Sequence, residues 1–307
     1  MGAYRAAGLF VVLSMLWGTA FVAIKAGLSE LPPVLFAALR YDLAGLLLIG
    51  YAAATTNRLI PDIRADWIAI GVGAVLLIAA YNALLFVGQQ GVTSAVGAIL
   101  VATAPILTTG FSRLLLPGEG LTPVGLVGLA SGFAGVGLIA VPGESLGVDA
   151  VLAPGLIFLA AVSVALGSVL LERTEEALPI ESTVAWSFLA GAVLLHLAAV
   201  ALPTESIGDA TVSREALLAL AYLAVFASVV GYVIYFRLLD RLGAVDISLV
   251  SYAVPVSAAV AGWTVLGEKI DGLAVAGFLL ILAGFVLIKR KALANRVAAL
   301  GERGVDG

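Results

Sequence analysis

The chain has 307 residues, of which 62% are hydrophobic and only 12% are charged, and its formal net charge is −4. With so small a charged fraction, a soluble domain of this size could not cover its surface with polar groups. The composition therefore excludes an ordinary soluble protein. The sequence contains no cysteine and a single histidine, His196, which excludes disulfide bonds and thiolate metal sites. We therefore expect an integral membrane protein that uses no cofactor or metal and binds no nucleic acid.

Apolar runs of about 20 residues, the length that crosses a bilayer, follow one another along the chain. No Ala-x-Ala-like cleavage site follows the first run, so we expect it to remain as a helix rather than to be removed as a signal peptide. The segments between runs are short, which leaves no room for a domain outside the membrane. The predicted membrane-spanning helices cover residues 8–28, 34–54, 66–88, 93–115, 122–141, 151–171, 183–202, 215–236, 244–266 and 272–289.

The distribution of lysine and arginine predicts the orientation of these helices. With the N-terminus placed inside the cell, the outer segments between the helices hold only Arg214 and Lys269, and the inner segments hold the other basic residues outside the helices. Because basic residues favour the cytoplasmic side, we expect both termini in the cytoplasm and the protein in the cell membrane. The polar tail, residues 291–307, is expected to extend the last helix as an amphipathic helix.

A helical hairpin motif occurs twice in the sequence, half a chain apart. Each copy has an apolar run broken by a proline, then a Gly-Glu pair, then a glycine-rich run: Pro105 and Gly118-Glu119 in one, Pro255 and Gly267-Glu268 in the other. The repeat indicates two copies of one unit, residues 1–145 and 146–290, followed by the tail at 291–307. Each copy holds five predicted helices, and because five is odd, the second copy must cross the membrane in the opposite direction.

The predicted fold is therefore an all-α polytopic membrane protein with ten transmembrane helices in two inverted five-helix repeats. Inverted repeats are typical of secondary transporters, whose binding sites lie near the middle of the bilayer. The inversion places Glu119 and Glu268 at opposite faces of the membrane. We therefore expect these two glutamates to cap equivalent turns rather than to share one binding site.

Several short motifs resemble those of a known family. Trp17-Gly18-Thr19-Ala20-Phe21 is similar to the WGxxF opening of EamA-type transporters, which belong to the drug/metabolite transporter (DMT) superfamily. The resemblance covers essentially the whole chain, and its other motifs are Leu39-Arg40-Tyr41, Ala102-Thr103-Ala104-Pro105, Gly118-Glu119, Val254-Pro255 and Leu266-Gly267-Glu268. It implies a central cavity lined mainly by helices 1, 3, 4, 6, 8 and 9, and export or exchange of small metabolites, amino acids among them.

Three charged residues lie more than two positions from the ends of the predicted helices: Lys25, Arg40 and Asp42. A charge at such depth is costly unless it is paired or faces water. Lys25 or Arg40 could attract an anionic group of a substrate, and Asp42 could bind and release a proton. The alternative is structural: Asp42 neutralises Lys25 or Arg40 between the first two helices, or Lys25 extends to the interface. We favour the structural interpretation for Lys25 and Asp42 and leave Arg40 open.

Uncharged polar and aromatic residues near the middle of the helices are the candidates for the cavity lining. Serine and threonine at such positions often only bond their own helix backbone, whereas a buried asparagine needs several partners. The predicted cavity residues are Trp17, Thr19, Asn82, Thr103, Ser163, Ser168, Tyr232, Ser251 and Tyr252.

Three other features complete the prediction. Pro105 and Pro255 each remove a backbone hydrogen bond, and their duplication favours a role as hinges. The glycines of Gly128-x-x-x-Gly132 fit close helix packing, and we leave open whether they also form a homodimer contact, because a monomer is sufficient for transport. His196 lies in the seventh helix, outside the implied cavity, so we expect it to serve packing rather than proton transfer.

These features predict a secondary transporter, an exporter or exchanger of a small organic metabolite such as an amino acid, that works by alternating access in the lipid bilayer. The alternatives are a passive channel or facilitator, a structural membrane partner and, less favoured, an intramembrane enzyme. The chain lacks the P-loop motif of ATP-driven transporters. It also lacks a second aspartate away from the ends of the predicted helices that could form a catalytic pair with Asp42, so we expect no enzymatic activity.

Overall fold

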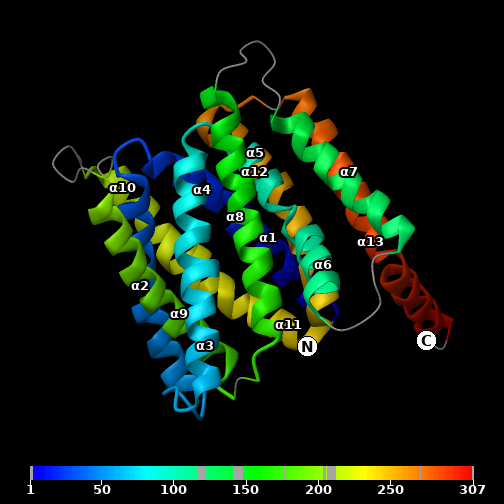
Figure 1. The fold of residues 1–307 in the computed structure, drawn as a ribbon, viewed down its shortest axis with the longest axis horizontal. Coiled ribbons are helices and arrows are strands. Elements are labelled where there is room, and N and C mark those ends of the chain that lie inside the picture. The colour runs from blue at the N-terminus through cyan, green and yellow to red at the C-terminus, as the bar shows by residue number, and fades with distance from the viewer. Residues whose placement is uncertain are drawn as a thin grey trace.

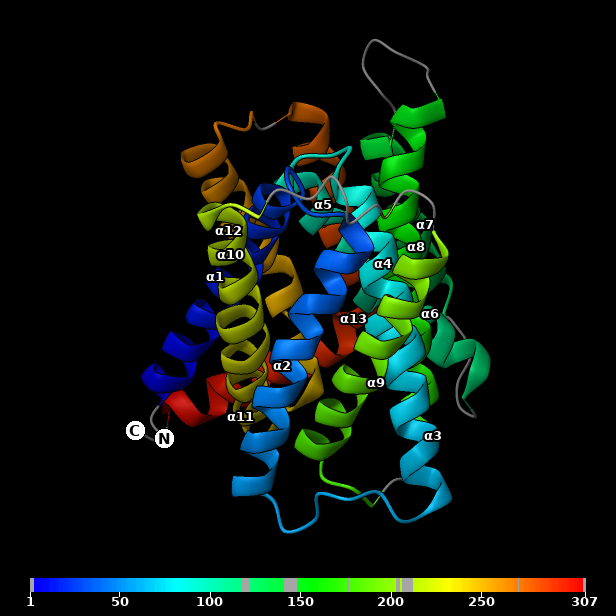
Figure 2. The same ribbon diagram turned by 90° about the vertical axis from the view of Figure 1, so that its left-hand side faces the viewer.

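The computed structural model describes residues 3–116, 122–140, 148–175, 177–202, 205, 212–269 and 271–305. In these ranges the secondary structure consists of helices joined by turns and irregular segments, without a strand, and the helices form one bundle (Figures 1 and 2). Nine helical stretches in the described ranges are long and apolar enough to cross a membrane, and the shorter apolar stretch Pro123–Ile139 completes the order of ten predicted from the sequence. The predicted all-α membrane fold is confirmed.

The first half of the chain runs from α1 to α7. The elements are α1 (Ala3–Gly27), α2 (Pro33–Thr55), α3 (Arg64–Val72), the π-helical segment η1 (Gly73–Ala80), α4 (Tyr81–Gln89), α5 (Ser94–Val101), α6 (Ala104–Leu115) and α7 (Pro123–Ala140). The segments α3, η1 and α4 form one continuous stretch, and α5 and α6 together form the fourth span.

The second half repeats this order from α8 to α13. The elements are α8 (Val148–Glu172), α9 (Ile180–Ala201), α10 (Arg214–Ala221), the π-helical segment η3 (Tyr222–Val230), α11 (Gly231–Ser248), α12 (Val250–Leu266) and α13 (Gly272–Val305). The predicted extension of the last helix into the polar tail is confirmed for the backbone, because α13 continues to Val305. In Figure 1, α1 begins at the lower end of the bundle and α8 at the upper end, so the two halves run in opposite directions.

The third span of each half contains a π-helical segment, η1 in the first and η3 in the second. Such segments widen a helix by one residue per turn and are common at functional sites. Because both halves contain a π-helical segment at the equivalent place, this departure from the α-helix is a feature of the repeated unit. Each segment leads directly into a helix, α4 or α11, that carries residues of the central site described below.

The duplicated prolines are placed differently in the two halves. In the first half the helix is interrupted at Ala102 and Thr103, immediately before Pro105, which lies in the first turn of α6. In the second half α12 runs through Pro255 without a break, and the turn lies earlier, at Leu249. The local interruption at the proline is therefore a feature of one half only, and the proposed hinge function of the two prolines stays a prediction.

Helix α7 and the first part of α13 pack closely on one side of the bundle, where Figure 1 shows them side by side. Glycines make this contact close: a Cβ atom at Gly128 would lie 2.7 Å from the carbonyl oxygen of Gly284, and one at Gly135 would lie 2.5 Å from that of Gly277. Side chains at these positions would push the two helices apart. The structural role predicted for the glycines of this helix is confirmed at Gly128.

Carboxylates of one half hold the N-termini of helices of the other half. Glu205, which follows α9 and is 7% exposed, accepts hydrogen bonds of 3.1 Å from the backbone N–H groups of Val34 and Leu35 in the first turn of α2. The first N–H groups of a helix have no partner within it, and the helix dipole favours a negative charge there. Glu205 therefore stabilises α2 through both effects.

Two further glutamates make the same kind of contact at the upper end of the bundle. Glu268, after α12, accepts a bond of 3.0 Å from the backbone N–H of Ser94, the first residue of α5. Glu30, after α1, accepts bonds from the backbone N–H and the hydroxyl of Ser213, the N-cap residue of α10. Glu268 thus has the structural role expected of it, although the helix that it caps belongs to the other half. Glu119 lies outside the described residues.

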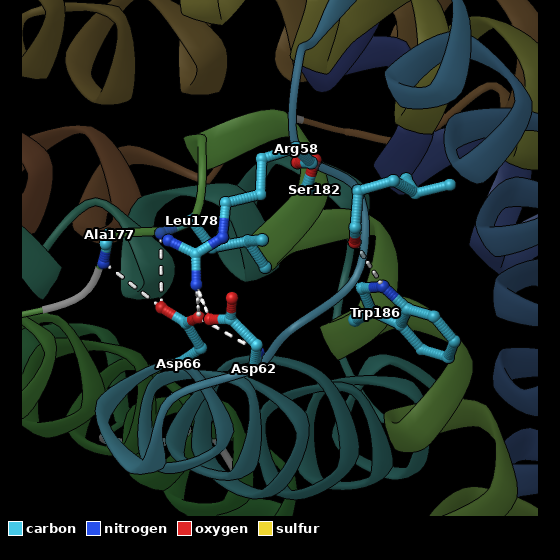
Figure 3. A network of polar contacts seen from close by, with 8 residues as sticks. Arg58, Asp62, Asp66, Ala177, Leu178, Ser182 and Trp186 are labelled. Atoms are coloured by element: carbon cyan, nitrogen blue, oxygen red, sulfur yellow. Dashed lines mark hydrogen bonds and ion pairs between the residues drawn. The ribbon is translucent and has the colours of Figure 1, made fainter.

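At the lower end, Asp66 in α3 holds the segment that leads into α9 (Figure 3). Its carboxylate is fully buried and accepts bonds of 3.1 Å from the backbone N–H groups of Ala177 and Leu178. The guanidinium group of Arg58 donates to the same carboxylate at 2.8 Å and also pairs with Asp62. Asp66 is therefore the counterpart of Glu205: each follows the second helix of its own half and holds the start of the equivalent helix in the other half.

Candidate functional site

Arg40 is the charged residue at the centre of the bundle. It lies on α2, seven residues after Pro33, which places it roughly 10 Å along the helix. Its side chain is only 8% exposed. Its Nε donates a hydrogen bond of 3.0 Å to the hydroxyl of Ser228 on η3, and its guanidinium carbon lies 5.0 Å from the centre of the Tyr41 ring. Residues of both halves therefore surround this cation.

A short hydrogen-bonded chain extends from Tyr41 into the first half. The hydroxyl of Tyr41 donates to Oδ1 of Asn82 at 3.3 Å, and Nδ2 of Asn82 donates to the carbonyl oxygen of Ile78 at 2.8 Å. Ile78 belongs to η1, so the π-helical segment supplies an acceptor for the buried amide. Asn82 is completely buried, and these contacts give it the partners that such an amide needs.

A cluster of aromatic rings in mutual contact lies next to these residues. The ring of Trp17 on α1 lies 5.9 Å from that of Tyr232 and 5.7 Å from that of Tyr235, both on α11. Tyr232 also meets the edge of Phe188 on α9 at 5.1 Å, and Phe188 meets Tyr41 at 4.8 Å. These contacts connect the aromatic cluster to the helix that carries Arg40.

The second π-helical segment fixes the position of Trp17. The indole Nε1 of Trp17 donates to the carbonyl oxygen of Ala227 in η3 at 3.1 Å. The hydroxyl of Ser228, the next residue, accepts from Arg40 and donates to the carbonyl oxygen of Leu223 at 2.9 Å. One π-helical turn therefore orients both the main aromatic residue and the central cation.

The structure brings together Trp17, Asn82 and Tyr232 of the predicted cavity residues, around Arg40. Several others bond helix backbone: Ser168 donates to the carbonyl of Val164, Thr103 to that of Leu100, and Ser163 crosses from α8 to that of Leu76 in η1. Thr19 bonds the backbone of its own helix and the hydroxyl of Tyr222, and Ser251 is half-buried on α12.

Two of the predicted residues lie in apolar surroundings instead. The ring of Tyr252 packs on Phe285 at 4.5 Å, in a cluster with residues of α5, α6 and α13. Its hydroxyl is sealed from solvent and has no hydrogen-bond partner among the described residues. Thr103 borders a small, open apolar hollow between α6, α7 and α8, whose other residues are Ile106, Leu107, Leu129, Gly132, Phe133, Val136 and Phe158.

The side chain of Lys25 caps the C-terminus of α4. Its Nζ donates to the carbonyl oxygens of Gln89, Gln90 and Val92, at 3.2, 3.1 and 2.6 Å, where α4 ends. Helix C-termini leave carbonyl groups without partners and attract positive charge. Lys25 is held by these bonds at the end of α4, away from the contacts of Arg40, and this geometry agrees with the structural interpretation.

The expected pairing of Asp42 with Lys25 or Arg40 is wrong. Asp42 on α2 contacts His196 on α9, with 2.6 Å between Oδ2 and Nε2, and each side chain is 39% exposed. Arg40 and Asp42 are two positions apart on one helix and therefore point to different sides. His196 thereby has a polar partner, which fits a histidine that packs between helices, and the contact links the two halves.

Tyr41, Tyr81 and Phe188 belong to the surroundings of Arg40 but were not predicted as site residues. Tyr81 begins α4 and directly precedes Asn82, the hydrogen-bond partner of Tyr41. Tyr41 is part of the Leu39-Arg40-Tyr41 motif, so its position next to a candidate charge was a usable signal. Phe188 carries no such signal, because a phenylalanine in an apolar helix is indistinguishable from a core residue.

An all-helical membrane bundle with two inverted halves and a polar centre between them defines the class of membrane transporters built from inverted repeats. The sequence pattern of the EamA-like transporter family matches residues 5–141 and again residues 152–290. The chain therefore belongs to the EamA-like transporter family, and the resemblance inferred from its motifs is confirmed.

Relatives support this assignment. The chain is 30% identical to the uncharacterized transporter YvbV of Bacillus subtilis over 97% of this chain and 95% of the relative. It is 30% identical to the uncharacterized inner membrane transporter YedA of Escherichia coli, over 86% and 84%. A Salmonella typhimurium protein named as a probable amino-acid metabolite efflux pump is 26% identical over 91% and 93%. A crystal structure with 23% identity covers 96% of this chain and 99% of its own with a TM-score of 0.65, which supports the fold.

Proposed function

We propose that this EamA-type membrane transporter is a secondary transporter that exports or exchanges a small organic metabolite, such as an amino acid, by alternating access. The observation that carries the proposal is the site around Arg40, because α1, α2 and α4 of one half and η3, α9 and α11 of the other meet there. A solute bound at this place contacts both halves, so its binding can be coupled to their relative movement.

The topology is part of the same proposal. Both ends of the chain lie at the lower end of the bundle in Figure 1, and the basic residues between helices predict that this end faces the cytoplasm. The amino-acid class is supported by the Salmonella typhimurium relative, whose name describes amino-acid metabolite efflux. The transporter names of the relatives also support the expectation that the chain catalyses no chemical reaction.

Counterflow separates a carrier from a passive channel. Purified protein is reconstituted into liposomes loaded with one unlabelled amino acid at a time. Entry of the same amino acid in radiolabelled form is then followed without an imposed ion gradient. A carrier gives a transient accumulation of label above equilibrium, whereas a channel gives only equilibration. Absence of accumulation for every amino acid tested would contradict the proposal. Protein-free liposomes provide the control.

A further inference from the structure

The terminal nitrogens of Arg40 have no partner among the described residues. Arginine stays charged at physiological pH and offers five N–H donors, yet only Nε is used, in the bond to Ser228. In the described residues, the sealed polar side-chain atoms without a partner are Gln89 Oε1 and Tyr252 Oη. The Nη atoms of Arg40 are therefore not sealed: they keep accessible surface although the side chain as a whole is more than nine-tenths buried.

The carboxylates of the surrounding helices are bound to other groups. Asp42 contacts His196, Asp66 contacts Arg58, and Glu205 and Glu268 accept from helix N-termini. Within the described ranges no carboxylate forms an ion pair with Arg40. A buried charge without a counter-ion is unfavourable, and the planar fork of two Nη groups fits the two oxygens of a carboxylate.

Aromatic rings lie beside this fork. The guanidinium carbon lies 5.0 Å from the centre of the Tyr41 ring, and the ring of Phe188 contacts both Tyr41 and Tyr232. The ring centres of Trp17, Tyr232 and Tyr235 lie within about 6 Å of one another, and these three residues are half-buried. Such rings favour the apolar or aromatic part of a ligand, and they also attract an ammonium group through their π faces.

From these contacts, we propose that Arg40 binds the carboxylate of the transported solute, an organic monocarboxylate whose remaining part lies against Trp17, Tyr232 and Tyr235. A single positive charge balances one carboxylate, whereas a doubly charged phosphate would keep an excess negative charge in a membrane interior. That the bound carboxylate is the transported solute rests on the proposed function. Binding at Arg40, however, can be measured without transport.

The experiment measures the thermal unfolding midpoint of the full chain in detergent. The probes are the common amino acids, benzoate, phenylacetate and octanoate, the amide of each carboxylate that responds, inorganic phosphate and phenyl phosphate. At least one carboxylate is expected to raise the midpoint by about 5 °C at a hundredfold excess over its Kd, and its amide is not. Stabilisation by no carboxylate, or by phosphate alone, would overturn the proposal.

Two variants distinguish an anion site from a structural arginine. Arg40→Met is expected to abolish the ligand-induced shift while the ligand-free midpoint stays equal to that of the wild type or rises, because a charge without a counter-ion is removed. Arg40→Lys keeps the charge but not the fork and should weaken binding at least about tenfold. Arg237→Met, the same change at an exposed arginine, is the control and should keep the full shift. A carboxylate shift that persists in Arg40→Met, or a ligand-free midpoint far below wild type, would refute the assignment.

The outcome is separable from that of the counterflow experiment. Carboxylate binding that depends on Arg40 without counterflow would reject the carrier proposal and keep the binding site. Counterflow of any solute by Arg40→Met at the rate of the wild type would reject the assignment of Arg40 and keep the carrier.

Discussion

The contact between Asp66 and the start of α9 makes a quantitative prediction of stability. Asp66→Ala removes the acceptor of three backbone N–H groups, those of Asp62, Ala177 and Leu178, and one partner of Arg58. Leu178 is 4% exposed, so its N–H loses its bond without access to water, at a cost of about 2 kcal/mol. Asp62 and Ala177 are exposed, so their N–H groups can bind water, and Arg58 keeps its pairing with Asp62; these losses together add about 1 kcal/mol. The expected loss in the free energy of unfolding is about 3 kcal/mol.

Equilibrium unfolding in mixed detergent micelles, followed by tryptophan fluorescence, measures this loss. Asp66→Asn keeps an acceptor oxygen for the backbone and gives up the charge, so it is expected to cost about half as much. Asp62→Ala is the matched control: it removes the other carboxylate that pairs with Arg58, but its side chain is 66% exposed and such pairs contribute less than about 1 kcal/mol. If Asp66→Ala and Asp62→Ala had equal effects, the role assigned to the buried carboxylate would be wrong.

Two further predictions concern helix packing and the contact between Asp42 and His196. Gly135→Ala is expected to destabilise the protein by about 1–3 kcal/mol, because its Cβ would collide with the backbone of α13, whereas Gly137→Ala on the same helix meets nothing within 4 Å and should be neutral or slightly stabilising. Thermal unfolding in detergent compares the two, and equal midpoints would disprove the close contact. Asp42→Asn is expected to lower the free energy of unfolding by less than about 1 kcal/mol, because the contact with His196 that it weakens is more than one-third exposed. The same unfolding measurement tests this, and a larger loss would refute it.

Hydropathy and the repeat were sufficient to predict the fold. The ten spans correspond in order to the helices observed, because long apolar runs leave a chain few alternatives in a bilayer. The inversion followed from an odd number of helices per half. The sequence does not reveal the π-helical segments η1 and η3, since the apolar residues that form them would fit an α-helix equally well. The sequence also suggests the same local structure at Pro105 and Pro255, whereas the helix is interrupted only beside Pro105.

The site was predicted less completely for a physical reason. Depth along a helix follows from counting residues, and it identified Arg40, Trp17, Asn82 and Tyr232 as central. Which side chains pair between helices depends on the rotation of each helix about its axis. A helix that is apolar on all sides does not specify this rotation in its sequence. The pairing of Asp42 with a histidine 154 residues away is therefore invisible in the sequence.

The exchange of carboxylates between the halves has a consequence for synthesis of the chain. Glu205 lies 171 residues after Val34, whose N–H group it accepts. At about 5–20 residues per second, ribosomes need roughly 10 to 30 s to make that stretch. During this time α2 exists without Glu205. Water or lipid headgroups must therefore accept hydrogen bonds from the first N–H groups of the helix. The first half of the chain therefore reaches its final hydrogen bonding only after the second half has begun to assemble against it.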